Sequence, residues 1–344
     1  MSVVTFLIGN GFDLACGLNS RYKDTYKGYT GSPSSSDVIK SFKDNIEEDI
    51  ETWADFEMAL AEYARKFEKE EDLIECIRDY KAYLIWYLKR ERENFYSFLQ
   101  NNADKRDALI QEMIPFLVCF FRDLTKNDRD AIWSALTNSY PPISCQFLSF
   151  NYTDIFDELE KQAFPWIENN GDNLIYSDNP VLHIHGKLGE DVVLGIDNES
   201  QLVNLKYQLS NRGRRAIIKP TAVEDYDTKR KKEALSQIQS SNVICVFGLS
   251  LEESDLTWKN AVRDWLLMNP DHHMVFFDYK LADKSCSEDI QKMDYEEDAK
   301  KERIKMLFGD TIDEDTKDRV FKQIHMPVSY TFFNAVNKKT EADQ

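Results

Sequence analysis

Short apolar runs alternate with amphipathic segments along much of the chain. Runs of about four to eight apolar, often β-branched residues predict buried strands, and apolar positions three or four residues apart predict helices. The expected strands are residues 3–8, 145–150, 181–185, 192–195, 242–248 and 273–279, and helical spacing between them covers 154–162, 229–240 and 254–268. Such alternation predicts an α/β fold, a doubly wound parallel sheet with helices on both faces.

A long helical block interrupts this alternation. Residues 37–142 are rich in charge and show helical spacing, and a Ser/Gly/Pro-rich stretch at 30–36 precedes them. In the simplest architecture the strands before and after the block belong to one sheet. We therefore expect an α/β core made of 1–36 and 143–290, with 37–142 as an inserted helical subdomain and 291–344 as a helical C-terminal extension.

The charge balance narrows the range of partners. The 344 residues include 43 Lys plus Arg against 61 Asp plus Glu, a formal net charge of −18. This excess of negative charge repels phosphate backbones, so we expect no nucleic acid as the main ligand. The sequence has no apolar run long enough to span a membrane, and its first residues lack the pattern of a signal peptide. We expect a cytoplasmic protein that does not enter a membrane.

The cysteines are far apart, and no two are spaced as CxxC. This usage predicts free, mostly buried thiols in a reducing compartment, and it leaves a cysteine-based zinc site without ligand spacing. The six residues are Cys16, Cys76, Cys119, Cys145, Cys245 and Cys286.

Two strand ends carry residues suited to a nucleotide. In open α/β sheets, ligands bind beyond the carboxyl ends of the strands. The first strand ends at Gly9-Asn10-Gly11-Phe12-Asp13, a G-x-G turn that can approach a phosphate, although glycines needed only for sterics explain it equally well. After the strand at 145–150, Asn151 can hold a ribose hydroxyl or a water without adding charge. Thr153 or Asp154 would instead cap the following helix.

Two later strand ends add an imidazole and a hydroxyl. His183 and His185 share one face of the expected strand at 181–185, with His185 at its carboxyl edge. The pair could ligate a metal, but no further ligands follow at the usual spacing. A single imidazole acting as acid, base or hydrogen-bonding partner needs only His185, and His183 would then be a core residue. The strand at 242–248 runs into Gly248, Ser250 and Asp255, which suit contact with a ribose or phosphate.

In chain order these segments resemble the sirtuin-like NAD-binding family. The turn at residues 9–13, Gly17-Leu18-Asn19-Ser20-Arg21-Tyr22, the Asn151 segment, His185-Gly186 and Gly248-Leu249-Ser250-Leu251 match its ordered motifs. Two departures matter. The chain lacks the paired CxxC motifs of the sirtuin zinc ribbon, which disfavours a protein deacetylase. The acid that contacts nicotinamide in the sirtuin pattern is displaced by one residue here, to Asp154.

A second resemblance covers nearly the whole chain, the helical block included. The stretches GNGFDL from Gly9, WADFE from Trp53, SFNYTD from Ser149, HIHG from His183 and GLSL from Gly248 look like the AbiH family of bacteriophage abortive-infection proteins. This resemblance implies a bacterial antiviral role, with nucleotide depletion as its means. It leaves open a phage-derived trigger and a homo-oligomer.

Together the resemblances imply hydrolysis of the nicotinamide N-glycosidic bond of NAD, with NAD as substrate and no further cofactor or metal. Asn151 would orient water or ribose, His185 would contact the ribose hydroxyls, and Asp154 would orient the carboxamide. The implied substrate-binding residues are Gly9, Asn10, Gly11 and Phe12 at the diphosphate and nicotinamide, Asp13 at a ribose, Arg21 at the diphosphate unless it is a plain surface arginine, and Gly248, Ser250 and Asp255 on the adenosine side.

Other classes of function remain open from the residues themselves. A nucleotide-sensing module would need the glycine turns and Ser250 without turnover. A metal-dependent phosphohydrolase or nuclease would use His183 and His185 with Asp191 or Asp197.

Two further features have a plain and a functional interpretation. A basic stretch forms either a solvated face or a contact to a phosphate-bearing ligand or activating molecule. It consists of Arg212, Arg214, Arg215 and Lys219, continued by Lys229-Arg230-Lys231-Lys232. Trp53 and Glu57, four residues apart on an expected helix, either pack or close over the pocket.

Overall fold

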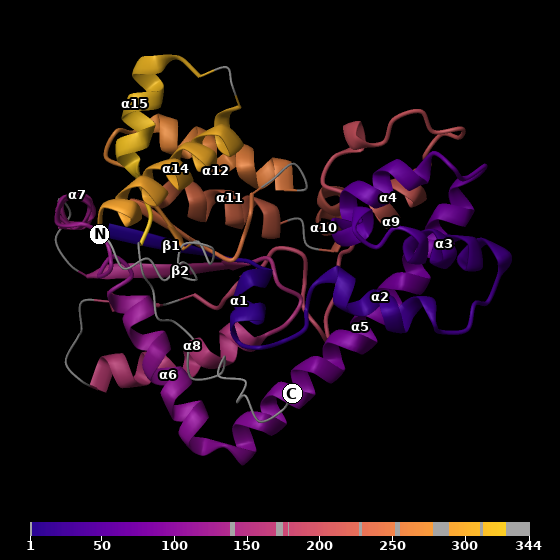
Figure 1. The fold of residues 1–344 in the computed structure, drawn as a ribbon, viewed down its shortest axis with the longest axis horizontal. Helices are drawn as coiled ribbons and strands as arrows, with labels where there is room; N and C mark the ends of the chain where they lie inside the picture. Colours follow the sequence, from indigo (N-terminus) through magenta and orange to yellow (C-terminus); the bar gives the residue numbers. More distant parts are fainter. Residues whose placement is uncertain are drawn as a thin grey trace.

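Parallel strands lie at the centre of the computed structural model, flanked by helices (Figure 1). The structure describes residues 2–137, 142–169, 175–177, 179–226, 229–251, 255–277, 289–309 and 312–327. Within these residues the sheet order is β3-β2-β1-β5-β6-β7, with β4 also paired to β2, and every pairing is parallel. The strands are β1 (Ser2–Ile8), β2 (Ile143–Ser149), β3 (Ile175–Tyr176), β4 (Leu182–His183), β5 (Val243–Phe247), β6 (His273–Phe277) and β7 (Ile324–His325).

The central strands align their carboxyl ends at one edge. Ile8 of β1 pairs with Ser149 of β2 on one side and with Phe247 of β5 on the other. The chain runs outward from β1 through β2 to β3 and β4, and then returns to the opposite side of β1 as β5. Open α/β sheets bind ligands at such a reversal of strand order. The predicted doubly wound α/β architecture is therefore confirmed as a parallel α/β sheet.

Helices cover both faces because the strands are apolar on both sides. In β5, Val243, Cys245 and Phe247 belong to one hydrophobic cluster, and Ile244 and Val246 belong to another. This two-residue period is the pleat of a doubly covered strand. In Figure 1, α11, α12, α14 and α15 lie above the sheet, with α1, α6 and α8 below it.

The helical elements mostly follow the predicted spacing. They are α1 (Asn10–Ala15), α2 (Tyr22–Thr30), α3 (Asp37–Glu48), the 3₁₀ turn η1 (Thr52–Ala54), α4 (Phe56–Ala64), α5 (Glu70–Asn101), α6 (Ala103–Val118), α7 (Lys126–Thr137), α8 (Ile155–Asn169), η2 (Glu199–Gln201), α9 (Asn211–Ile217), α10 (Lys219–Tyr226), α11 (Arg230–Ser240), α12 (Leu256–Met268), α14 (Asp289–Phe308) and α15 (Glu314–Gln323). No helix of the described residues is both long and apolar enough to cross a membrane.

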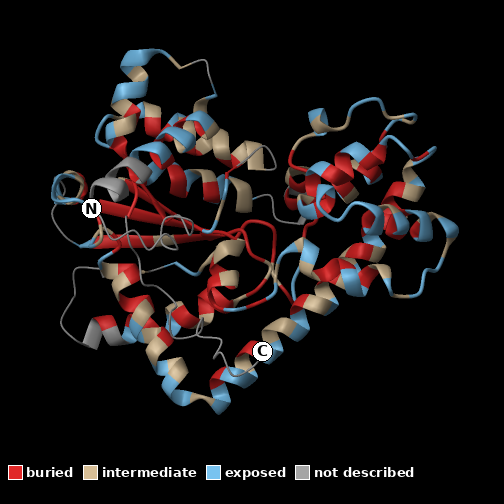
Figure 2. Ribbon diagram, viewed as in Figure 1, coloured by how far each residue is buried: buried red, intermediate tan, exposed pale blue. Residues whose placement is uncertain are grey.

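A helical lobe lies beside the sheet and has its own hydrophobic core (Figure 2). It consists of α2, α3, η1, α4, the first half of α5 and residues 188–218. The boundaries of the hydrophobic clusters differ from the boundaries of the insert that was expected at 37–142. The first half of α5 packs in the lobe, whereas Phe95 and Leu99 near its end join α6 below the sheet. Apolar side chains between Leu188 and Ile218, far along the sequence, complete the lobe. The long helix α5 thus contributes to both cores.

Several predicted details were wrong. Residues 192–195 form no strand, and next to them only an isolated bridge joins Ile196 to Ile218. Leu194 packs into the lobe, and Val193 packs against Ala222 and Val223 of α10. The short pairings of β3 and β7 lacked an apolar run long enough to predict them. Trp53 and Glu57 do not share a helix, since Trp53 lies in η1 and Asp55 caps α4 after it.

Other predictions meet the limits of the described residues. Five cysteines are free, and all but Cys119 are buried. Cys286, Ser254 at the expected start of a helix, and residues 278–279 of the last expected strand lie outside the described residues.

Candidate functional site

Two glycine turns meet where the strand order reverses. The backbone N–H of Gly11, after β1, donates to the carbonyl of Gly248, after β5, at 2.9 Å. A Cβ on Gly11 would lie 2.4 Å from the Cα of Gly248, and Gly248 has a φ of +67°. Both positions therefore require glycine, which lets the two turns touch backbone to backbone.

This contact uses the N–H groups that were expected to hold a diphosphate. Gly9 donates to Phe247, Gly11 donates to Gly248, and the N–H of Phe12 donates back to Gly9. Gly9, Gly11 and Phe12 are not among the residues that line the adjacent cavity. The first turn therefore serves chiefly to join two loops, which is the steric interpretation of its glycines.

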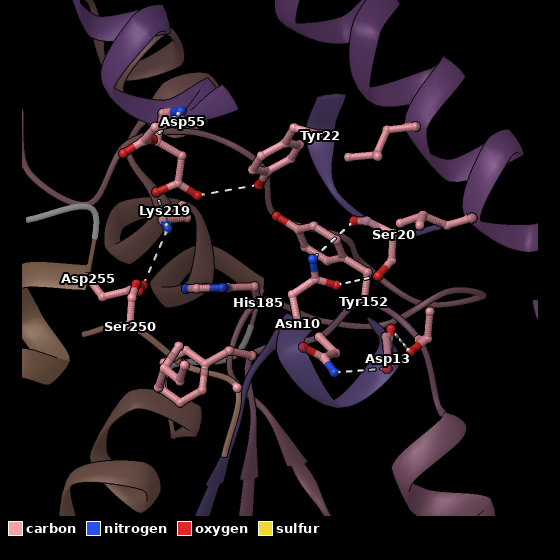
Figure 3. Close-up of a pocket in the computed structure, with 18 of the residues that line it drawn as sticks. Asn10, Asp13, Ser20, Tyr22, Asp55, Tyr152, His185, Lys219, Ser250 and Asp255 are labelled. Carbon is pink, nitrogen blue, oxygen red and sulfur yellow. Dashed lines mark hydrogen bonds and ion pairs between the residues drawn. The ribbon is translucent and has the colours of Figure 1, made fainter. Parts of the chain in front are cut away.

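A cavity of about 330 Å³ opens at this edge of the sheet (Figure 3). Its walls come from the turns after β1, β2 and β5, from the lobe and from the start of α10. Of the predicted site residues it collects Asn10, Asp13, Asn151, His185, Gly248, Ser250 and Asp255. The structure thus brings together residues from four distant segments of the chain.

Asp13 is a buried carboxyl group held by two neighbours. Thr153 Oγ1 donates to one of its oxygens at 2.6 Å, and Asn151 Nδ2 donates to the other at 3.0 Å. Burial raises the pKa of Asp13 to about 7, although these two hydrogen bonds act in the opposite direction. Asp13 therefore changes charge near neutral pH, inside the cavity.

The contact with Asp13 also orients Asn151. Because Nδ2 of Asn151 is committed to the carboxyl group, its Oδ1 must serve as the free acceptor. This Oδ1 is buried and has no hydrogen-bond partner within the structure. A buried acceptor without a partner is costly, and it points to a ligand or water that donates to it.

His185 presents a neutral imidazole to the same cavity. In Figure 3 its ring lies between the Lys219 side and the Asp13 side. Burial, together with the charges of Lys219 and Arg230, lowers the pKa of His185 well below its ordinary value. No described group hydrogen-bonds the ring, which packs edge-on against Phe150 at 5.7 Å. A neutral, unengaged imidazole can accept a proton or a hydroxyl hydrogen bond.

Sequence reasoning left a buried ion pair out of the site. Lys219 Nζ lies 2.6 Å from Glu57 and 3.9 Å from Asp255, and all three line the cavity. Burial disfavours the ammonium charge, but the two carboxylates outweigh it and raise the pKa of Lys219. Lys219 therefore stays charged beside His185. The basic stretch and the Glu57 position were visible in the sequence, but their convergence from α10 and α4 was not.

Other lining residues set the shape of the cavity. Asn10 is fixed by Ser20, whose Oγ donates to Asn10 Oδ1 at 2.6 Å. Tyr152 donates to the carbonyl of Val193 at 3.0 Å. Tyr22, Asp55 and Tyr152 also line the cavity. They lie in the stretches quoted for the family resemblances, but their spacing did not single them out, because the lobe brings Tyr22 and Asp55 to the cavity.

Asp154 and Arg21 lie outside the cavity lining. Arg92 binds the Asp154 carboxylate through two hydrogen bonds of 2.6 Å, and Tyr96 adds a third at 3.1 Å. This arrangement ties Asp154 to α5, so the expected contact of its carboxylate with a carboxamide has no support in its placement. Arg21 is exposed at the start of α2.

The two histidines have different surroundings. His183 hydrogen-bonds the carbonyl of Asn151 through Nδ1 and the carboxylate of Asp157 through Nε2 at 3.0 Å. Both of its ring nitrogens are therefore engaged, as expected of a core histidine. Asp191 is exposed, and Asp197 accepts from the backbone of Thr257. Within the described ranges no cluster of three or more His, Cys, Asp or Glu side chains could hold a metal ion.

Comparison with known families identifies a family that covers most of the chain. The model of the family described as "Bacteriophage abortive infection AbiH" matches residues 5–278, which begin within β1 and include the strands from β2 to β6, the lobe and every lining residue of the cavity. No curated protein and no solved structure matches the chain significantly.

Proposed function

The chain belongs to the bacteriophage abortive infection AbiH family, and from this premise we propose that it acts by hydrolysing NAD+ to nicotinamide and ADP-ribose. One observation carries the proposal: Asn151 Oδ1 is a buried acceptor without a partner, beside a carboxyl group and a neutral imidazole in one cavity. The cavity lies where α/β sheets bind nucleotides. Its volume of about 330 Å³ lies within the range typical of small-molecule sites.

The reaction asks little of titratable groups. The bond between ribose C1′ and the pyridinium nitrogen breaks with its electron pair going to nicotinamide, which leaves as a neutral molecule and needs no acid. A water oxygen then bonds to C1′ and gives up one proton. The enzyme must stabilise the positive charge on the ribosyl group and position that water.

The cavity offers a group for each task. Ionised Asp13 places a negative charge beside the developing oxocarbenium ion, and Asn151 Oδ1 accepts a hydrogen bond from the water or from a ribose hydroxyl. His185 accepts the proton of the water. Lys219, held by Glu57 and Asp255, keeps an ammonium group on the other side of His185.

The test measures nicotinamide released from NAD+ by the full chain and by Asn151→Ala and His185→Ala. We expect each substitution to lower kcat by about 100-fold or more, in line with the loss of a positioning or general-base group. Asn101→Ala is the matched control, because Asn101 is exposed at the end of α5 and does not line the cavity. Thermal unfolding of each variant verifies that it is folded.

The outcomes separate the competing functions. Full turnover by both variants would contradict the proposed mechanism. Binding of NAD+ without nicotinamide release would instead favour a nucleotide-sensing module. Loss of activity with EDTA would favour the metal-dependent alternative, whereas glycosidic cleavage by the groups above requires no metal.

A further inference from the structure

A second cavity, of about 250 Å³, lies between α5, α9, α10 and the segment at residues 192–194. Four cations line it, although the chain as a whole carries a net charge of −18. Arg78 and Lys81 project from α5, three residues apart and so on one helix face. Arg212 and Arg215 come from α9.

Three of these cations have no close partner. Within the described residues, Arg78, Lys81 and Arg212 form neither a hydrogen bond nor an ion pair within 4.0 Å. The nearest acidic influences are Asp191 on Lys81 and Glu70 on Arg212. Asp191 is exposed, and Glu70 already accepts hydrogen bonds from the hydroxyl and the backbone N–H of Ser210. Burial lowers the pKa of Lys81, so an anion beside it would be stabilising.

The floor of this cavity is apolar. It is formed by Ile77, Val192, Val193, Leu194, Ala216 and Ala222. A rim of cations over an apolar floor matches a compact organic molecule that bears a phosphate, because guanidinium groups pair with phosphate oxygens. The small volume of the cavity and the net negative charge of the chain disfavour a polynucleotide.

The two cavities share a wall. Val193 lines the basic cavity, and its backbone N–H donates to the carbonyl of His185 at 2.8 Å. The carbonyl of Val193 accepts the hydroxyl of Tyr152, which lines the first cavity. Helix α10 carries Ala222 in one cavity and Lys219 in the other. A shift of this wall therefore moves residues on both sides.

We propose that the basic cavity is a second binding site, for a small phosphate-bearing molecule, and that its occupancy acts on the first cavity through Val193 and α10. The binding part of this proposal is independent of the chemistry in the first cavity. Its regulatory part rests on the proposed NAD+ hydrolysis.

The binding test is a calorimetric titration of the full chain with inorganic pyrophosphate at low ionic strength. The variant Arg78→Gln/Lys81→Gln removes two rim charges. The control Lys40→Gln/Lys89→Gln removes two exposed charges from α3 and α5 that do not line the cavity. We expect saturable binding by the wild type, about tenfold weaker binding by the rim variant, and a change below about twofold in the control.

Two results would overturn the site. One is a wild type that does not bind pyrophosphate, and the other is a folded rim variant that binds it as tightly as the wild type does, which would place the ligand elsewhere, such as beside Lys219. If the double variant does not fold, Arg78→Gln alone serves, because Arg78 is exposed. We expect about threefold weaker binding in that case.

The coupling test uses hydrogen exchange, which needs no turnover. We expect pyrophosphate to slow amide exchange in the segment from Ile184 to Leu194 in the wild type and to leave it unchanged in the rim variant. Equal exchange with and without bound pyrophosphate would overturn the coupling. In parallel, nicotinamide release should change at saturating pyrophosphate. A chain that binds pyrophosphate and protects this segment, yet never cleaves NAD+, would refute the proposed hydrolysis and leave the second site standing.

Discussion

Among the described residues, histidines and carboxylates gather near both ends of the parallel sheet. At the carboxyl end, His185, Asn151 and Asp13 line a cavity. Near the amino end of β6, an amino-end cluster consists of Asp128, His273 and His325. His273 bonds His325 at 2.9 Å, and His325 bonds Asp128 at 2.9 Å.

The two groups of residues differ in how many of their hydrogen-bonding atoms have a partner. Both ring nitrogens of His325 are engaged, and Asp128 also binds Thr125 and lies 3.9 Å from Lys300. At the carboxyl end, the His185 ring and Asn151 Oδ1 lack partners within the described structure. Similar residue types therefore serve stability in one place and remain available to a ligand in the other. Residue type alone does not separate the two roles.

The largest expected effect is on turnover, at the carboxyl end. Asp13→Asn keeps the shape of the side chain and removes its negative charge. We expect kcat for nicotinamide release to fall by about 100-fold or more, because the charge that faces the ribosyl cation is lost. The most sensitive measurement is the rate of nicotinamide release at pH 8, where Asp13 is ionised. A kcat within about threefold of the wild type would remove Asp13 from the mechanism.

The amino-end cluster should show the opposite behaviour. His325→Ala leaves Asp128 and His273 without their shared partner inside the protein. We expect the free energy of unfolding to fall by about 3 kcal/mol, since buried polar groups lose their hydrogen bonds. Denaturant titration measures this loss. Nicotinamide release by the folded fraction should stay at the wild-type rate, and a selective loss of kcat would contradict the structural role.

Opposite pH dependences sharpen the contrast. Burial raises the pKa of Asp13 to about 7, so its contribution to stability is complete below pH 3.8 and is lost as the pH rises through 7. Burial opposes the charge of Asp128, but His325 and Lys300 outweigh it and lower its pKa to about 2, so its contribution persists at neutral pH and is lost as the pH falls through 2.

The two Asp→Asn variants should therefore differ in sign. We expect Asp13→Asn to raise the free energy of unfolding at pH 8 by about 2 kcal/mol, and Asp128→Asn to lower it at pH 7 by about 2 kcal/mol. The Asp13→Asn gain should vanish at pH 4, where the wild-type carboxyl is protonated. Thermal midpoints between pH 4 and 8 measure both changes. Changes of the same sign at pH 8 would contradict these assignments.

The smallest effect is expected next to the amino-end cluster, on the surface of α7. Lys126 and Asp130 form an ion pair of 2.6 Å, but both side chains are more than half exposed. Lys126→Ala should change the free energy of unfolding by less than about 0.5 kcal/mol. Lys126→Ala is the baseline for His325→Ala. A decrease in the free energy of unfolding as large as that of His325→Ala would show that the position on α7, and not burial, determines the effect.

Local sequence signals predicted much of the fold. The apolar runs of β1, β2, β5 and β6 predicted central strands, because a strand buried on both faces needs apolar residues throughout. The pairings of β3 and β7 span two residues each, too few for a recognisable pattern, whereas β4 lies within the strand expected at 181–185 but covers only two of its residues. The segment at 192–195 misled the prediction, since Leu194 packs in the lobe, Val193 packs against α10, and the segment forms no strand.

The candidate site was predicted in part. Asn151, His185 and Ser250 follow strands, and parallel strands bring their carboxyl ends to one edge, so these residues converge as expected. Phe12 follows the same rule but points into the core, where its ring packs against Phe156 at 5.2 Å. Asp154 pairs with Arg92 of a helix that is remote in sequence.

The sequence by itself determined the central strands, the edge at which their ends meet and the glycines at the reversal of strand order, because these depend on apolar period and on backbone sterics. Only the tertiary structure decided which polar groups remain available there. It engaged His183 with Asp157 and left the His185 ring without a hydrogen bond. It also brought Lys219 to Glu57 across 162 positions of the chain. Such choices depend on burial and on partners far apart in sequence, which no local pattern encodes.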